Sequence, residues 1–260
     1  MIYEIDECGR KNPLLYPKGQ CLNDPAGRRC RLALITEHSG KQRDVATAPS
    51  QVSGPNLRHE ENSMSYAIIG FGAVGQALAR AFARKNIEVA VASRRPPQAL
   101  APQAQAIGST VVPKTLREAI KADVIILAVP FWEHREVAKN LASWQGKTII
   151  DAMNVIGVPV EDLSGLPSSA FVAKAFPGAR LVKGFNHLPA GTLSADPDVK
   201  SGRRVVFLSS DDEGAAALVA ALAEQLGFAP VNLGKFGEGG ALVQARGKSW
   251  GPLIFQDLFK

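Results

Sequence analysis

Cysteine is scarce in this sequence, and none follows Cys30. The spacings of Cys8, Cys21 and Cys30 match neither a C-x-x-C metal knuckle nor a compact redox pair. We therefore expect unpaired, solvated thiols and no bound metal.

Long apolar runs and dense basic runs are also missing. No hydrophobic stretch approaches the roughly 18 residues of a membrane span, and the first residues lack a basic-then-apolar signal pattern. The net charge of +6 comes from basic residues scattered along the chain, without interleaved aromatic residues. We expect a cytoplasmic protein that binds neither membranes nor nucleic acid.

Residues 1–63 lack a sustained hydrophobic period, apart from the short stretch RLALITEH at residues 31–38. This segment is rich in Pro, Gly, Asn and charged residues, a composition typical of disorder. We expect a dispensable, disordered N-terminal extension; a targeting or regulatory segment is the alternative. The content of 46% hydrophobic residues is ample for a core in the remainder.

Regular periodicity begins at Met64. An apolar run at residues 66–70 predicts a strand, residues 73–86 have helical spacing, and residues 87–93 predict a second strand. Gly70, Gly72 and Gly75 form G-x-G-x-x-G at the turn between the first strand and the helix. Gly70 permits the tight turn, Gly72 the approach of a pyrophosphate, and Gly75 close packing of helix on strand. The motif predicts dinucleotide binding at the helix N-terminus; glycines used only for packing are the alternative.

The residues after the second strand distinguish the two nicotinamide dinucleotides. A site that prefers NAD usually places a carboxylate there for the ribose 2′-hydroxyl, but this sequence has Ser93, Arg94 and Arg95. A serine hydroxyl can donate to a 2′-phosphate, and arginine can pair with its oxygens. This favours NADP(H), although the arginines could also simply solvate a loop.

The pattern continues with a short strand at residues 109–112, a helix at 114–122 and a buried strand at 123–130. Ala128, Val129 and Pro130 at the end of that strand are expected to line the cofactor. His134 follows at a helix start, and we expect it to be a solvated surface residue. The next strand ends at Asp151 and is followed by a polar turn with Asn154.

The second half predicts strands at residues 205–210 and 229–234 with an amphipathic helix between them. We read Asp211, Asp212 and Glu213 at its start as helix-capping charge and not as a metal site. The expected fold is α/β, a Rossmann-type doubly wound parallel sheet with a small C-terminal α/β lobe. We divide it into an NADP-binding Rossmann domain at 64–180 and a substrate or dimerisation lobe at 181–260.

Six stretches together carry a family resemblance: YAIIGFGAVGQALAR, ASRR, ILAVPFWEHREVAKNL, KTIIDAMN, LVKGFNHLPAGTL and SSDDEGAAALVAALAEQLGFAPVNLGKFGEGGALVQ. In their order, residues 65–260 resemble the NADPH:coenzyme F420 oxidoreductase family. The resemblance implies a Rossmann domain with a small C-terminal lobe, a homodimer, and direct hydride transfer between nicotinamide and a deazaflavin.

The resemblance also implies roles for individual residues. It places Ser93 and Arg94 on the 2′-phosphate, with the pyrophosphate on Gly70, Phe71, Gly72, Ala73, Val74 and Gly75. Along the nicotinamide it places Ala128, Val129 and Pro130. Around the second ring it places Asn154, Asn186, His187, Leu188 and Pro189. His187 stands where family members commonly carry threonine, and Gly184 and Phe185 also depart from the family pattern, which leaves the hydride acceptor open.

Hydride transfer between a nicotinamide and a flavin-like ring needs the two rings stacked with the reacting carbons about 3 to 3.5 Å apart. No protein acid or base is obligatory. We therefore expect an NADPH-dependent oxidoreductase that reduces a small molecule: coenzyme F420, a flavin-like compound or a metal chelate. A carbonyl or imine reductase with His187 as its proton donor is an alternative, and so is a hydroxyacid dehydrogenase with His187 or Lys183 as its base. A non-catalytic NADPH-binding redox sensor is another.

Overall fold

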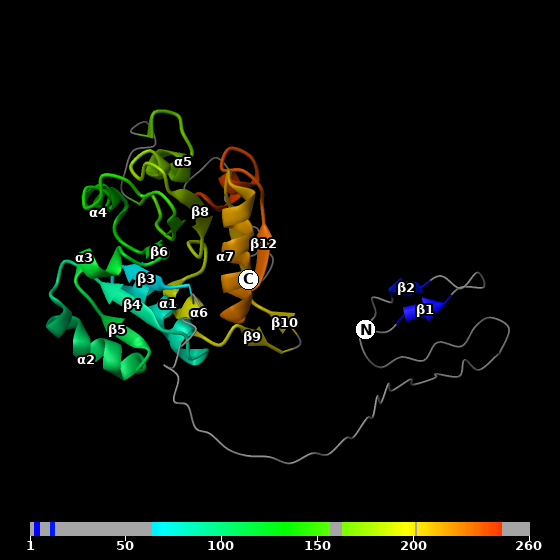
Figure 1. Cartoon of the computed structure of the whole chain (residues 1–260), viewed down its shortest axis with the longest axis horizontal. Helices are drawn as coiled ribbons and strands as arrows, with labels where there is room; N and C mark the ends of the chain where they lie inside the picture. Colours follow the sequence, from blue (N-terminus) through cyan, green and yellow to red (C-terminus); the bar gives the residue numbers. More distant parts are fainter. Residues whose placement is uncertain (1–2, 6–10, 14–63, 157–162, 201, 246–260) are drawn as a thin grey trace, which may run out of the picture. The chain divides into compact units, whose positions relative to one another are not determined.

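The computed structural model describes residues 3–5, 11–13, 64–156, 163–200 and 202–245 (Figure 1). The chain divides into two compact units, Met1–Leu57 and Arg58–Lys260. In the first, strands β1 (Tyr3–Ile5) and β2 (Lys11–Pro13) pair antiparallel. The rest of the predicted N-terminal extension, including its three cysteines, lies outside the described residues.

The second unit opens with the predicted strand–helix–strand. The apolar run forms β3 (Tyr66–Ile69), helix α1 covers Ala73–Arg84, and β4 covers Val89–Ala92. β3 and β4 are parallel, with Ile68 opposite Val91. Parallel neighbours cannot be joined by a tight turn and need a longer crossover connection, which α1 provides here.

One eight-stranded sheet runs through this unit in the order β12-β11-β8-β7-β6-β3-β4-β5. Its six strands from β3 to β8 run parallel to one another. Numbered from β3, these six follow the order 3-2-1-4-5-6 of a doubly wound dinucleotide-binding sheet, which confirms the predicted fold class. Besides β3 and β4, the six parallel strands are β5 (Val111–Pro113), β6 (Val124–Leu127), β7 (Thr148–Asp151) and β8 (Arg180–Gly184).

Two strands after β8 extend this same sheet. β11 (Val205–Ser209) pairs antiparallel with β8, and β12 (Ala229–Asn232) pairs parallel with β11. Helix α7 (Glu213–Gln225) connects β11 to β12, and the Asp212 side chain caps it by accepting from the Ala215 N–H at 2.7 Å. The capping interpretation of the acidic residues is thus confirmed at Asp212.

Side chains alternate between two apolar layers along each central strand. Ile68 belongs to one cluster while its neighbours Ala67 and Ile69 belong to the other, as the strand period of two requires. The first layer contains residues of α1, α2 (Pro97–Ile107), α6 (Ala190–Ser194) and α7; the second contains residues of α3 (Leu116–Ala119), α4 (His134–Ala138) and α5 (Ser168–Ala173). Helices therefore cover both faces of the sheet (Figure 1).

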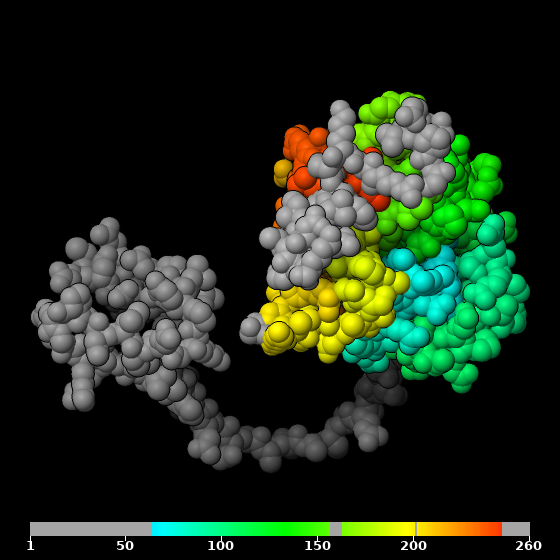
Figure 2. All heavy atoms as spheres, turned by 180° about the vertical axis from the view of Figure 1, so that it is seen from behind, coloured from blue at the N-terminus to red at the C-terminus, as the bar shows by residue number. Residues whose placement is uncertain are grey.

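Short elements complete the unit. A 3-10 turn at Phe131–Glu133 leads into α4, another covers Gly239–Val243, and β9 (Asp198–Val199) pairs with β10 (Gly202–Arg203). α6 packs against α1, and Figure 2 shows the yellow segment that holds α6 beside the cyan start of the sheet. No helix among the described residues is long and apolar enough to cross a membrane.

Candidate dinucleotide-binding site

A cavity of about 630 Å³ opens at the carboxyl ends of β3, β4 and β6. The chain reverses its direction of strand addition between β3 and β6, the position where open α/β sheets bind their ligands. The cavity is lined by Ile69, Gly70, Phe71, Gly72, Ser93, Arg94, Arg95, Leu116, Ala128, Val129, Pro130, Glu133, Glu136 and Val137. The fold therefore brings together three predicted groups: the glycine turn, the end of β4 and the end of β6.

Two of the motif glycines are required by close backbone contacts. Gly70 has φ +104°, and a Cβ there would lie 2.2 Å from the carbonyl oxygen of Ala128. A Cβ at Gly75 would lie 1.9 Å from the carbonyl oxygen of Gly70. Both distances are far below van der Waals contact, so only glycine allows this turn and this approach of α1 to β3.

Gly72 differs from the other two because its Cβ direction is open. No atom lies within 4 Å of a Cβ built there, and its backbone is extended at φ −84°. Gly72 is the N-cap of α1, yet no side chain caps this terminus within the described part of the chain, and the first turn holds no acidic residue. The free N–H groups and the positive end of the helix dipole at Ala73, Val74 and Gly75 are suited to an anion such as a pyrophosphate.

Ser93, Arg94 and Arg95 form the turn after β4. The Ser93 hydroxyl accepts from the Arg95 N–H at 3.0 Å, and the Arg95 guanidinium donates to Gln103 Oε1 at 3.2 Å. The Arg94 side chain is 84% exposed and contacts Glu133 Oε1 through Nη1 at 3.1 Å. The fold thus places the Glu133 carboxylate beside the Ser93–Arg95 turn, which has no acidic residue of its own.

Glu133 and Glu136 were not among the predicted site residues. They lie on the segment that follows Pro130, and both line the cavity. The sequence could have indicated both residues, because they follow the strand end at Ala128–Pro130, where the chain was already expected to pass near the cofactor.

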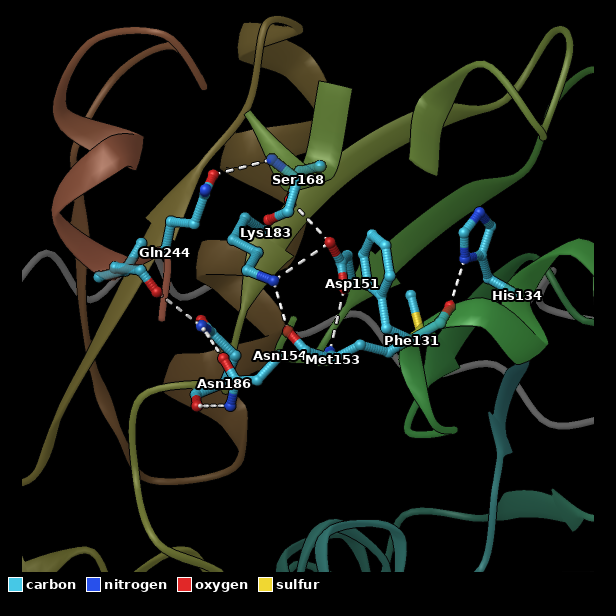
Figure 3. A network of polar contacts seen from close by, with 11 residues as sticks. Phe131, His134, Asp151, Met153, Asn154, Ser168, Lys183, Asn186 and Gln244 are labelled. Atoms are coloured by element: carbon cyan, nitrogen blue, oxygen red, sulfur yellow. Dashed lines mark hydrogen bonds and ion pairs between the residues drawn. The ribbon is translucent and has the colours of Figure 1, made fainter. Parts of the chain in front are cut away.

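Asn154 and Asn186 contact each other but do not line this cavity. Asn154 Nδ2 donates to the Asn186 carbonyl at 2.8 Å, and Asn186 Nδ2 donates to Asn154 Oδ1 at 2.9 Å and to the Val243 carbonyl at 2.7 Å. Phe185, directly before Asn186, has the left-handed φ of +61°. The turns after β7 and β8 are therefore fastened to each other at the carboxyl edge of the sheet (Figure 3).

A buried ion pair joins the ends of β7 and β8, directly before these turns (Figure 3). Lys183 Nζ on β8 lies 3.2 Å from Asp151 Oδ2 on β7, and their side chains are 4% and 0% exposed. Asp151 also accepts from the Ser169 hydroxyl at 2.7 Å and from the Met153 N–H at 3.0 Å, while Lys183 donates to the Met153 carbonyl. Asp151 and Lys183 together bind the N–H and the carbonyl of Met153. Because the Lys183 ammonium group already makes these buried contacts, it is poorly placed to act as an acid–base group toward a substrate.

The structure makes His187 a neutral side chain. Burial lowers the pKa of His187 to about 4, and the hydrogen bond with the Val205 carbonyl opposes this only in part. Its ring lies 4.9 Å from that of Phe207, on β11, and it does not line the cavity. A neutral imidazole that contacts β11 is a poor proton donor for chemistry near neutral pH.

The prediction that His134 is solvated was wrong. Its side chain is 0% exposed, with Nδ1 against the Phe131 carbonyl, and burial lowers its pKa. Its ring lies among those of Phe131, Trp132, Phe171 and Phe176. It lines no part of the cavity. The described residues also contain no group of three His, Cys, Asp or Glu side chains placed to hold a metal ion.

Comparison with known proteins identifies relatives of this chain. A family model described as "NADP oxidoreductase coenzyme F420-dependent" matches residues 65–155. The hypothetical protein SMa0349 from Sinorhizobium meliloti is 39% identical with a TM-score of 0.69, and the match covers 74% of this chain and 95% of that chain. A protein from Arthrobacter sp. FB24, provisionally named an F420-dependent NADP reductase, is 26% identical with a TM-score of 0.56, covering 67% of this chain and 86% of that one.

Metalloreductases form a second group of relatives. Metalloreductase STEAP3 of Rattus norvegicus is 30% identical over 169 residues, which are 64% of this chain and 33% of that protein. The chain thus spans about a third of the length of the metalloreductases that it matches.

Proposed function

Because this chain belongs to the family of coenzyme F420-dependent NADP oxidoreductases, we propose that it transfers hydride between NADP(H) and coenzyme F420 or another flavin-like acceptor. NADP-dependent oxidoreduction follows from the family itself. The acceptor and the residues that bind it are the proposal.

One observation carries the cofactor assignment. A single cavity joins the uncapped N-terminus of α1, where Gly72 leaves open space, to the Ser93–Arg95 turn. The first feature suits a pyrophosphate, and the hydroxyl and guanidinium groups of the second suit a 2′-phosphate. The site is therefore matched to both anionic parts of NADP(H).

The protein's part in the reaction is to bind and orient the two rings. Hydride transfer from a bound nicotinamide to a deazaflavin is chemistry that the cofactors themselves supply. In this proposal the backbone at Ala128, Val129 and Pro130 supports the nicotinamide side. The fastened turns at Asn154 and Asn186 form a rigid edge for the acceptor ring. No protein proton donor is required, which agrees with the neutral state of His187.

The test follows the absorbance of oxidised F420 after NADPH is added to the purified whole chain, with NADH as the control. We expect bleaching that depends on enzyme and is much faster with NADPH. Arg94→Ala should raise the Kd for NADPH about tenfold or more, since it removes a charge-assisted contact to the phosphate. Arg80→Ala is the matched control, because Arg80 is exposed on α1 and does not line the cavity. NADPH binding without bleaching would reject F420 as the acceptor.

A metal chelate is the second acceptor to test, because the chain is 30% identical to metalloreductase STEAP3 over the matched residues. Hydride carries two electrons and a ferric ion accepts one, so a flavin would have to mediate between them. Ferric chelate reduction that requires both NADPH and added flavin would favour this acceptor.

The remaining alternatives make different predictions. A carbonyl or imine reductase that uses His187 as its proton donor should lose turnover on His187→Gln. A redox sensor should bind NADPH tightly and should not oxidise it, whichever acceptor is added.

A further inference from the structure

Glu133 reaches the dinucleotide cavity from a segment far from the Ser93–Arg95 turn in sequence. It lies in the 3-10 turn after β6, and its Oε1 is 3.1 Å from Arg94 Nη1. Arg94 is 84% exposed while Glu133 is 32% exposed, so the carboxylate is the more fixed partner. The ion pair therefore lies on the cavity wall at the turn proposed to bind the 2′-phosphate.

A 2′-phosphate and this carboxylate require the same guanidinium. Both are anions that bind arginine through charge-assisted hydrogen bonds. A phosphate placed on Arg94 would also lie within a few ångströms of Glu133, where like charges repel even at the high effective dielectric of a protein surface. Glu133 thus opposes the phosphate in two ways, by occupying its partner and by its own charge.

NADH does not compete with Glu133 for Arg94, because its ribose carries a free 2′-hydroxyl in place of the 2′-phosphate. A carboxylate at this position is the group that NAD-binding sites use to accept from that hydroxyl. Such sites normally supply it from the end of the second strand, whereas here the fold supplies it from the segment after β6. One side chain can therefore disfavour NADPH and favour NADH.

We propose that Glu133 is a specificity-determining residue that competes with the 2′-phosphate for Arg94 and so narrows the preference of this site for NADPH over NADH. This role rests on the proposed function, since it presumes that NADP(H) binds in the cavity. The sequence of the turn after β4 predicts only a preference for NADPH, whereas Glu133 acts against that preference.

The test measures the Kd values of NADPH and NADH for the whole chain and for Glu133→Gln, by titration without any hydride acceptor. We expect the variant to bind NADPH about three to ten times more tightly, since an exposed ion pair and a nearby like charge are both removed. NADH binding should stay the same or weaken. The ratio of the two Kd values is the decisive readout, because a merely structural change would shift both dinucleotides together.

Glu136→Gln is the matched control. Glu136 also lines the cavity, but it pairs at 2.7 Å with Lys139, the residue directly after α4, and not with Arg94. Its removal tests the general effect of one negative charge, and the Kd ratio should shift much less than in Glu133→Gln. An equal shift in both variants, an unchanged ratio, or weaker NADPH binding in Glu133→Gln would overturn the role of Glu133 alone. Wild-type protein that binds neither dinucleotide would overturn the proposed function as well.

Discussion

The three glycines of the G-x-G-x-x-G turn have separable roles at the level of single residues. Gly75→Ala places a methyl group 1.9 Å from the Gly70 carbonyl oxygen, so α1 must move away from β3. We expect a loss of about 1–3 kcal/mol or more in the free energy of unfolding, as measured by urea denaturation.

Gly72→Ala should have the opposite profile. The added methyl group meets no atom within 4 Å, so the free energy of unfolding should change by less than about 1 kcal/mol. It would project into the space before α1, and NADPH titration should show a Kd raised about tenfold. If the two variants lost stability equally while Gly72→Ala kept full NADPH affinity, the assignment of pyrophosphate to this turn would fail.

His187 predicts a pH dependence of stability. In the folded protein its pKa is about 4, but in the unfolded chain it titrates near its ordinary 6.5. Between these values the unfolded state binds more protons, so the contribution of His187 to stability is complete above pH 6.5 and is lost as the pH falls toward 4. His187→Gln should reduce the slope of unfolding free energy in this window by up to about 1.4 kcal/mol per pH unit. His134 would maintain part of the slope, because its pKa is also lowered. Identical slopes in the variant and the wild type would show that His187 does not titrate as described.

Residue-level prediction from sequence succeeded where a local turn determines the geometry and failed where distant segments meet. The close approaches at Gly70 and Gly75 agree with the roles expected from their spacing. Glu133 was missed because the fold joins it to a residue 39 positions earlier. The burial of His134 was missed because the aromatic rings around it come from the 3-10 turn, α5 and the segment after α5.

At the level of elements, the ion pair between β7 and β8 should matter for stability. Lys183→Met leaves the Asp151 carboxylate buried without its cation, and we expect a loss of about 3–5 kcal/mol in urea denaturation. Lys139→Met is the control, because it breaks an exposed pair with Glu136 and should cost less than about 1 kcal/mol. Equal losses in the two variants would contradict a structural role for the buried pair.

The hydrophobic period predicted most of the strands but not how the later ones assemble. Apolar runs located β3, β6 and β7 because parallel strands buried on both faces are nearly continuous in hydrophobic character. The helix expected at 114–122 is only Leu116–Ala119, with a capping box between Thr115 and Glu118. The period also cannot reveal strand order, so it did not indicate that β11 and β12 extend the sheet.

At the level of the whole molecule, the resemblance predicts a homodimer, which we propose for this chain. Light scattering during size-exclusion chromatography should give about twice the chain mass of 27.6 kDa. A mass of one chain across a range of concentrations would reject the dimer.

The central claim is direct hydride transfer, and isotope transfer tests it most directly. The whole chain would be mixed with F420 and NADPH deuterated at one face of nicotinamide C4, and then with the opposite epimer. A deazaflavin accepts hydride on carbon, so the label does not wash out into water. We predict that one epimer, and not the other, delivers deuterium to the reduced F420. Reduced F420 that lacks deuterium with both epimers would contradict direct transfer between the two rings.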